Sequence, residues 1–259
     1  MEPSIYEYPA IFRRVHMEKP SEIGAEVAFM RKVWRRHLKR PVRRALDVAC
    51  GDSPHGLALA RAGIEVAGID RSPTMIAKGR KEAGAAPIRF YRRPIERFRI
   101  PERPFDAAFF MSETFPIMTD NRALLSHLDS VGRLLGRGGL YCVDIDRHDG
   151  VEVVDARKLW RQREVNAEGT WVDVREYHRP IAWSSGMHSI YELECTIHFP
   201  AGTVVTRDIV PVRYTVPSLL ELAARASGYF TLVGCYPDLS LTKPIEKCHG
   251  RWFGVLRRI

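Results

Sequence analysis

The sequence predicts an α/β protein with a doubly wound, mostly parallel sheet and an inserted antiparallel β subdomain. Two patterns predict this class. Between residues 44 and 146, short apolar segments alternate with segments of helical period, which is typical of parallel strands joined by helices. After Asp149 the pattern changes to segments in which apolar and polar residues alternate, as in antiparallel strands with one wet face.

The first half of the chain supplies most of the parallel sheet. Residues 1–20 are expected to form an irregular or partly helical arm, followed by a helix at 21–38. Apolar segments predict five strands, at 44–50, 65–70, 87–91, 105–111 and 140–146. Periodicity predicts helices at 54–63, 72–83 and 121–135. Ser53 and Ser72 are the expected N-caps of the first two, each followed by a first-turn proline.

The second half begins with the antiparallel segments and then returns to the α/β pattern. Period-two alternation is visible at 170–180, 188–199 and 203–216. A helix at 217–228 and strands at 229–236 and 251–258 complete the core. The predicted organisation is an arm or lid at 1–20, an α/β core at 21–150, an antiparallel insertion at 151–215 and a completion of the core at 216–259.

Composition indicates an ordinary globular protein of 259 residues, with 45% hydrophobic and 27% charged residues. No segment resembles a signal peptide or reaches the roughly 18 apolar residues of a membrane span. The five cysteines show no CxxC spacing. We therefore expect a cytoplasmic protein with reduced thiols, no bound metal and no membrane contact. The net charge of +9 comes partly from residues 31–44, which either form a solvated helix face or contact phosphates.

The turn ACGDSPHG, at residues 49–56, argues against two common nucleotide motifs. A dinucleotide fingerprint needs G-x-G-x-x-G, but Ala49, Gly51 and Pro54 occupy its three glycine positions. Proline at the last position opposes the close helix packing that the third glycine permits. The G-x-x-x-x-G-K-[ST] phosphate loop is also absent from the sequence.

An acidic residue nineteen positions after Gly51 indicates a ribose site. Asp70 ends the predicted strand at 65–70, where a carboxylate can accept both ribose hydroxyls. The structural alternative for Asp70 is a favourable charge at the N-terminus of the following helix.

These motifs, in this order, resemble those of class I S-adenosylmethionine (SAM)-dependent methyltransferases, particularly small-molecule enzymes with sequence like CGTGRHALELARRG. The matching segments here are CGDSPHGLALARAG, FDAAFFMSETFPIM, LLGRGGLYCVDID and VRYTVPSLLELAARASGY. The resemblance covers most of the chain and implies a Rossmann-like methyltransferase sheet that uses SAM and releases S-adenosylhomocysteine (SAH). Two departures stand out. Only Gly51 remains of three motif glycines, and Pro94 replaces the Asp that often binds adenine in the family.

The resemblance implies a cofactor site at the carboxyl ends of the strands. Asp70 is expected to bind the ribose hydroxyls, and Ile95 to offer its backbone N–H and apolar side to adenine. The full set of expected cofactor residues is Asp47, Ala49, Cys50, Gly51, Asp52, Ser53, His55, Asp70, Arg71, Met75, Ile95, Met111 and Ser112.

The acceptor side needs few catalytic groups, because displacement at a sulfonium methyl depends mainly on alignment. A base is required only for a hydroxyl or a protonated amine, and Glu113 and His148 are its candidates. Glu113 could instead hold a cationic amine, and loop solvation is the structural alternative for each. The expected substrate contacts are Tyr6, Tyr8, Thr114, Asp146, Arg179, Arg213 and Tyr214.

The sequence thus predicts an enzyme that methylates a nitrogen or oxygen of a small-molecule acceptor. The insertion favours this function, because a cover over a compact pocket suits a small ligand; it is also a candidate homodimer interface. Two alternatives stay open. An RNA methyltransferase would use the basic segment 31–44, although no Asn/Asp-Pro-Pro-Tyr-type motif follows the fourth strand. A non-catalytic partner protein with this fold would explain the missing glycines and Pro94.

Overall fold

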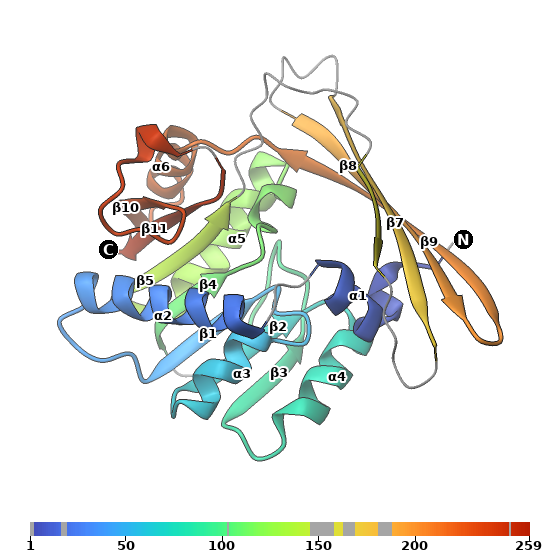
Figure 1. The fold of residues 1–259 in the computed structure, drawn as a ribbon. Coiled ribbons are helices and arrows are strands. Elements are labelled where there is room, and N and C mark those ends of the chain that lie inside the picture. Colours follow the sequence, from blue (N-terminus) through green and yellow to red (C-terminus); the bar gives the residue numbers. More distant parts are fainter. Residues whose placement is uncertain are drawn as a thin grey trace. The chain divides into compact units, whose positions relative to one another are not determined.

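The computed structural model describes residues 3–16, 20–102, 104–145, 158–162, 169–180, 188–248 and 250–259 (Figure 1). The chain divides into two compact units. We call Lys19–His148 with Thr215–Ile259 the α/β unit, and Met1–Glu18 with Asp149–Tyr214 the β unit. The N-terminal segment therefore belongs to the same unit as the inserted antiparallel strands.

The sheet of the α/β unit has seven strands in the order β10-β11-β5-β4-β1-β2-β3 (Figure 1). All neighbours pair in parallel except β11, which is antiparallel to both β5 and β10. The prediction of a doubly wound, mostly parallel sheet is confirmed. The strands are β1 (Arg44–Val48), β2 (Glu65–Asp70), β3 (Ile88–Arg92), β4 (Phe105–Phe110), β5 (Leu135–Ile145), β10 (Phe230–Pro237) and β11 (Trp252–Arg258).

Helices cover both faces of this sheet, and β4 shows why. Phe109 packs in one core with Met30 of α2 and Leu59 of α3, whereas Phe110 packs in another with residues of α5 and α6. A strand buried on both faces is expected to be mostly apolar, as FDAAFF is, and its one charged residue, Asp106, pairs with Arg40. The helices are α2 (Pro20–His37), α3 (Pro54–Arg61), α4 (Pro73–Ala83), α5 (Asn121–Leu134) and α6 (Pro217–Ala226), with short 3₁₀ turns η2 (Phe115–Ile117) and η4 (Ile245–Lys247).

Two local expectations need correction. The Ser53 side chain makes no capping hydrogen bond to α3, although Pro54 begins that helix as predicted. Ser72 does cap α4, because its hydroxyl accepts from the Met75 amide at 3.3 Å. Strand β5 starts at Leu135, directly after α5, so the Gly-rich residues 136–139 belong to the strand and not to a separate turn.

The β unit contains an antiparallel sheet in the order β6-β7-β8-β9, with strands β6 (Lys158–Gln162), β7 (Trp171–Pro180), β8 (His188–Phe199) and β9 (Gly202–Arg213). Strand β6 was not predicted from the sequence. The buried face of β8 carries Leu193, Cys195 and Ile197, as the period-two pattern indicates. Ile5 of η1 (Ile5–Glu7) and Ile11 of α1 (Pro9–His16) cover this face.

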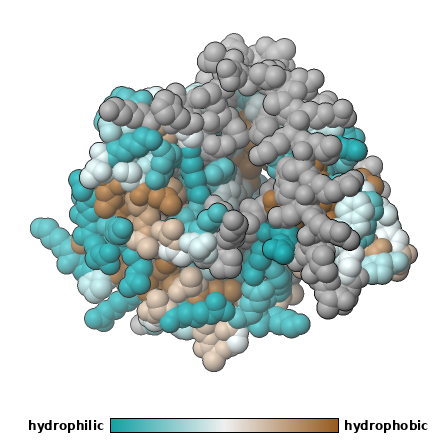
Figure 2. Space-filling model, in the orientation of Figure 1, coloured by the Kyte–Doolittle hydropathy of each residue, from teal (hydrophilic) through white to brown (hydrophobic). Residues whose placement is uncertain are grey.

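The surface in Figure 2 is mostly hydrophilic, with smaller apolar areas between the polar side chains. Among the residues whose side chains the structure describes, the exposed large apolar ones are Val205, Ile209, Leu222 and Ile259. Among the helices that the structure describes, none is long and apolar enough to cross a membrane.

Candidate active site

The backbone of the first loop keeps a left-handed conformation at alternate residues. Ala49, Gly51 and Ser53 have φ values of +52°, +54° and +59°. These are the positions at which a G-x-G-x-G motif places its glycines, since glycine adopts positive φ without a steric penalty. The loop therefore has the conformation of the glycine motif although two of the three glycines are replaced. Each replacement costs about 1–2 kcal/mol of backbone strain.

Hydrogen bonds within the loop hold this strained turn. The Ser53 hydroxyl donates to Asp47 Oδ2 at 2.6 Å, and the Ser53 amide donates to the Cys50 carbonyl at 2.6 Å. The Cys50 amide in turn donates to the carbonyl of Ile69, at 2.9 Å. Burial raises the pKa of the Asp47 carboxyl to about 8. The Asp47 and Ser53 side chains are therefore hydrogen-bonded to each other within the turn.

Asp70 joins the first loop to the end of β2. Gly51 N–H donates to its Oδ2 and Ser72 N–H to its Oδ1, each at 2.8 Å. Burial raises the pKa of Asp70 even though these hydrogen bonds favour the charged form. Each carboxylate oxygen can accept more than one hydrogen bond, so Asp70 retains capacity for hydroxyl donors. A Cβ at Gly51 would lie 3.0 Å from Met75 Cε, so the loop closely approaches α4 at this point.

Other predicted cofactor residues engage protein groups through their side chains. Asp52 is buried and pairs with Lys78 of α4 at 2.7 Å. Cys50 packs with Ile76 and Phe90, and burial raises its pKa. His55 is buried and pairs with Glu26, whereas Arg71 is exposed. Their predicted contacts to a cofactor stay predictions.

A buried histidine that sequence reasoning assigned to no site holds the loop after β3. His127 Nδ1 contacts the Ile95 carbonyl and Nε2 contacts the Tyr141 hydroxyl, both at 2.7 Å. Burial lowers the pKa of His127 to about 4, so the ring is neutral at pH 7. Because a carbonyl only accepts, Nδ1 carries the proton and Nε2 accepts from Tyr141. Ile95 is buried here, next to the exposed Pro94.

A second strained turn follows β4. Met111 is buried, and the next two residues, Ser112 and Glu113, are exposed with φ values of +59° and +54°. The Thr114 hydroxyl donates to the Ser112 carbonyl at 2.9 Å, and the Glu113 amide donates to Asp144 Oδ2 at 3.1 Å. The turn therefore presents Glu113 at the carboxyl edge, next to β5.

An ion cluster that includes the buried carboxylates of Asp144 and Glu26 lies beside this turn, and it was not predicted from the sequence. Arg251 contacts Asp144, Glu26 and Glu113, and Glu26 also contacts His55. The available signal was the acid inside the apolar run YCVDI, because a buried carboxylate needs a counter-ion. Sequence spacing alone does not identify Arg251, 107 positions away, as that partner.

The remaining predicted acceptor residues lie outside the described residues or belong to the β unit. Asp146 and His148 lie outside the described residues, as does the side chain of Arg179. Tyr6 packs against Phe12 and Tyr8 against Phe199, within the β unit. Arg213 is buried and Tyr214 partly buried at the end of β9. Substrate contact by these residues, and a covering or dimerising role of the insertion, stay predictions.

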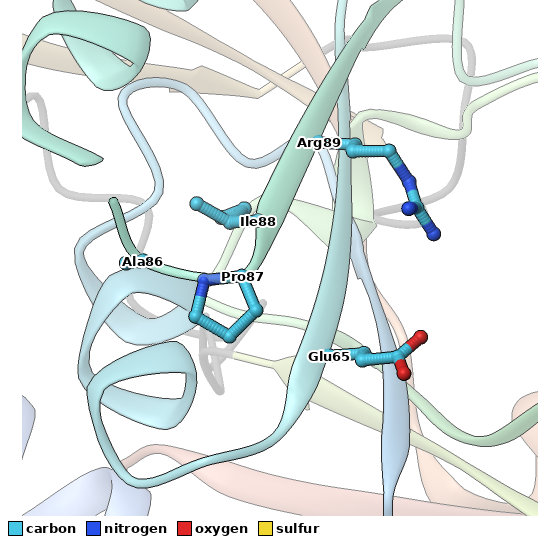
Figure 3. A pocket seen from close by; sticks show the side chains of 5 residues that line it. All are labelled: Glu65, Ala86, Pro87, Ile88 and Arg89. Atoms are coloured by element: carbon cyan, nitrogen blue, oxygen red, sulfur yellow. The ribbon is translucent and has the colours of Figure 1, made fainter. Parts of the chain in front are cut away.

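A surface depression of about 500 Å³ lies at the opposite end of the sheet (Figure 3). It is lined by Glu65 at the start of β2, by Ala86 and Pro87, and by Ile88 and Arg89 at the start of β3. Ligands of open parallel sheets bind at the carboxyl ends of strands, near the point where the strand order reverses. Here that point lies between β1 and β4, so we assign the candidate site to the loops described above.

Comparison with known proteins identifies a family that part of the chain matches. Residues 45–139 match a family described as methyltransferase domain. They include the strained loop, Asp70 and the turn after β4. No curated protein is matched by the sequence.

Several solved structures share the fold over nearly their whole length. A SAM-dependent methyltransferase from Clostridium acetobutylicum has a TM-score of 0.78 at 14% identity, covering 97% of both chains. The sugar N-methyltransferase KedS8 from Streptoalloteichus has 0.74 at 20% identity, covering 95% of this chain and 91% of that one. The SAM-bound amino pentose methyltransferase CalS10 from Micromonospora echinaspora has 0.72 at 17% identity, covering 100% and 98%.

Fold and family match define the class of protein: it has the class I methyltransferase fold, and the predicted resemblance is confirmed. Residues 45–139 match a methyltransferase domain, and the solved structures that share the fold include a SAM-dependent methyltransferase.

Proposed function

We propose that the protein is a SAM-dependent methyltransferase that methylates a nitrogen or oxygen of a small-molecule acceptor, with a sugar derivative as the favoured acceptor class. The observation that carries the cofactor assignment is the left-handed turn at residues 49–53, whose Gly51 amide is bonded to the Asp70 carboxylate. The methyltransferase domain match supports it. The sugar class is supported by KedS8 and CalS10, which resemble this chain across the insertion as well as the core.

The residues present fit such a cofactor. At Gly51 a Cβ would lie 3.0 Å from Met75 Cε and the backbone φ is +54°, so both the space and the conformation favour glycine at this turn. Asp70 is the residue proposed to accept the ribose hydroxyls. Ile95, whose carbonyl is bonded to His127, is proposed to place an apolar wall and its amide toward adenine. Pro94 contributes no carboxylate there, so adenine would be recognised without a charged acceptor at that position.

Bound SAM supplies a methyl group already activated by its sulfonium charge. The protein's part is then to align the acceptor and exclude water, which contributes roughly 7–11 kcal/mol in well-oriented reactions. Glu113, at the carboxyl edge beside β5, is the described residue proposed to receive a proton from the acceptor or to hold its ammonium group. His148 stays a second candidate outside the described residues.

Calorimetric titration with SAM and SAH tests the cofactor proposal. The wild type should bind both, and Asp70→Ala should weaken SAH binding by at least about 100-fold, because two hydrogen bonds to a charged group are each worth about 1.5–3 kcal/mol. Glu65→Ala, at the opposite end of the same strand, is the matched control and should bind like the wild type. Absence of heat with wild-type protein at high micromolar ligand would refute the proposal.

The two alternatives are affected differently by the structure. A non-catalytic role was suggested by the missing glycines, but the loop keeps the glycine conformation without them. An RNA acceptor retains one supporting observation, the exposed basic side chains of Arg31, Lys32 and Arg35 on α2. Binding of single-stranded RNA that weakens steeply with added salt would favour that alternative, and no binding would remove it.

A further inference from the structure

Arg251, from the C-terminal part of the chain, lies at the carboxyl end of β5. It directly precedes β11, whose first residue, Trp252, pairs with Ile145 at the end of β5. Its guanidinium donates to both oxygens of Asp144, through Nε at 2.7 Å and Nη2 at 2.6 Å. Such a two-point contact fixes the orientation of the carboxylate as well as its position.

Two further carboxylates from other elements contact the same guanidinium. Glu26 of α2 pairs with Nη2, and Oε1 of Glu113 lies 3.5 Å from Nε. The side chains of Asp144 and Glu26 are 0% and 2% exposed, so both have lost most of their hydration. Buried carboxylates of this kind are costly unless a cation is held among them. Arg251 therefore holds α2, β5 and the turn after β4 in one electrostatic cluster.

The turn after β4 needs such support. Ser112 and Glu113 are consecutive non-glycine residues in the left-handed region. Residues of this kind persist only where the surroundings determine their conformation, and they gather at functional sites. Here the Glu113 amide is bonded to Asp144, which Arg251 orients, and the Glu113 carboxylate lies beside Arg251 itself.

We propose that Arg251 is a positioning residue of the methyl-transfer site. With Asp144 it holds the Ser112–Glu113 turn, so that the Glu113 carboxylate stays at the carboxyl edge on the acceptor side. The inference rests on the proposed function, because Glu113 has this task only if methyl transfer occurs at this edge. A carboxylate held there also favours a ligand with positive charge at the reacting sulfur.

Hydrogen exchange of the turn tests the positioning step directly. In Arg251→Met, amides of residues 112–115 should exchange roughly tenfold faster, because the charged contacts that hold the turn are lost. Amides of β1 should keep their wild-type rates. Arg251→Lys keeps the charge without the planar fork and should give an intermediate rate. Arg257→Met is the matched control, since Arg257 lies on β11, the strand that Arg251 precedes, and donates to the His37 carbonyl.

The ratio of SAM to SAH affinity is the second readout, because SAM alone carries the sulfonium charge. Glu113→Gln should lower the preference for SAM over SAH by about threefold or more, because it removes a nearby negative charge. Arg251→Lys keeps the positive charge of the cluster, so a lower preference for SAM in that variant reports displacement of the Glu113 carboxylate. A residue with a purely structural role would weaken both ligands by the same factor.

The proposal is overturned if exchange at 112–115 is unchanged in both Arg251 variants, or rises in step with exchange in β1. An unchanged ratio of SAM to SAH affinity in both Glu113→Gln and Arg251→Lys also overturns it. Should Arg251→Met not fold, Arg251→Lys carries both readouts. If the wild type binds neither ligand, the proposed function fails, and the exchange rates still decide whether Arg251 holds the turn.

Discussion

At the scale of single residues, the first loop shows that backbone conformation and amino-acid identity can separate. The missing glycines suggested a damaged cofactor loop, yet Ala49 and Ser53 adopt the glycine conformation. Contacts with surrounding groups offset the free-energy cost of this strain, and one of them is the hydrogen bond that the Ser53 hydroxyl donates to Asp47. Such compensation depends on contacts between side chains, so a motif search that counts glycines does not detect it.

Ala49→Gly should stabilise the protein by about 0.5–1 kcal/mol. Glycine removes a left-handed penalty of about 1–2 kcal/mol, partly offset by about 0.4–1 kcal/mol of added chain entropy in the unfolded state. Denaturant unfolding measures the change. Ala58→Gly, in the middle of α3, is the control and should destabilise by about 1 kcal/mol, since its backbone is helical. Equal destabilisation by both substitutions would contradict the role of strain.

Asp47→Asn should change how stability depends on pH. The folded-state pKa of about 8 is above the unfolded value near 4, so the folded state binds the extra proton between these values. Wild-type stability therefore contains a contribution that is lost as pH rises from about 4 to 8, with a slope of up to about 1.4 kcal/mol per pH unit. Asparagine lacks this titration. The stability of the variant relative to wild type should thus increase from pH 5 to pH 8 in urea unfolding, and a flat difference would refute it.

At the scale of elements, period-two alternation predicted β8 well, because burial of one face of a strand requires every second residue to be apolar. What covers that face was not predictable in the same way. It is the N-terminal segment, anchored where Ser4 Oγ and the Ile5 amide donate to the Asp208 carboxylate at 2.6 and 2.9 Å. Ser4 and Asp208 are 204 positions apart, so no local sequence pattern indicates that they are in contact.

Asp208→Ala should loosen the N-terminal segment without unfolding the α/β unit. Loss of two hydrogen bonds to a charged group should raise the local opening population roughly tenfold or more. Trypsin cleavage after Arg13 or Arg14 in α1 reports this opening. Asp173→Ala, which removes a carboxylate from β7 of the same sheet, is the control and should leave the cleavage rate near that of the wild type. Equal cleavage of both variants would show that apolar packing alone holds the segment.

At the scale of the whole molecule, the two compact units predict separate responses to a cofactor. SAH at 100 times its Kd should stabilise the α/β unit by about 2.7 kcal/mol and raise its Tm by roughly 5–10 °C. Temperature-dependent hydrogen exchange resolves the two units. The β unit should show a smaller shift, and an equal shift in both units would mean that they unfold together.

The depression at the amino ends of β2 and β3 supplies a control for this experiment. Arg89→Ala should leave the SAH-induced shift unchanged, because Arg89 begins β3 and the proposed site lies at the carboxyl ends. Loss of the SAH-induced shift in Arg89→Ala would indicate that SAH binds at the amino ends of the strands, which would contradict the proposed site at their carboxyl ends.

The sequence by itself determined the α/β class and the antiparallel insertion, and it identified Gly51 and Asp70 as candidate cofactor residues. These follow from periodicity and from spacing along adjacent strands, which are local properties of the chain. Only the tertiary structure decided that Ala49 and Ser53 stand in for glycines, that His127 holds the loop carrying Ile95, and that Arg251 joins Asp144, Glu26 and Glu113. Those contacts form because burial of a polar or charged group requires a partner, wherever in the chain that partner lies.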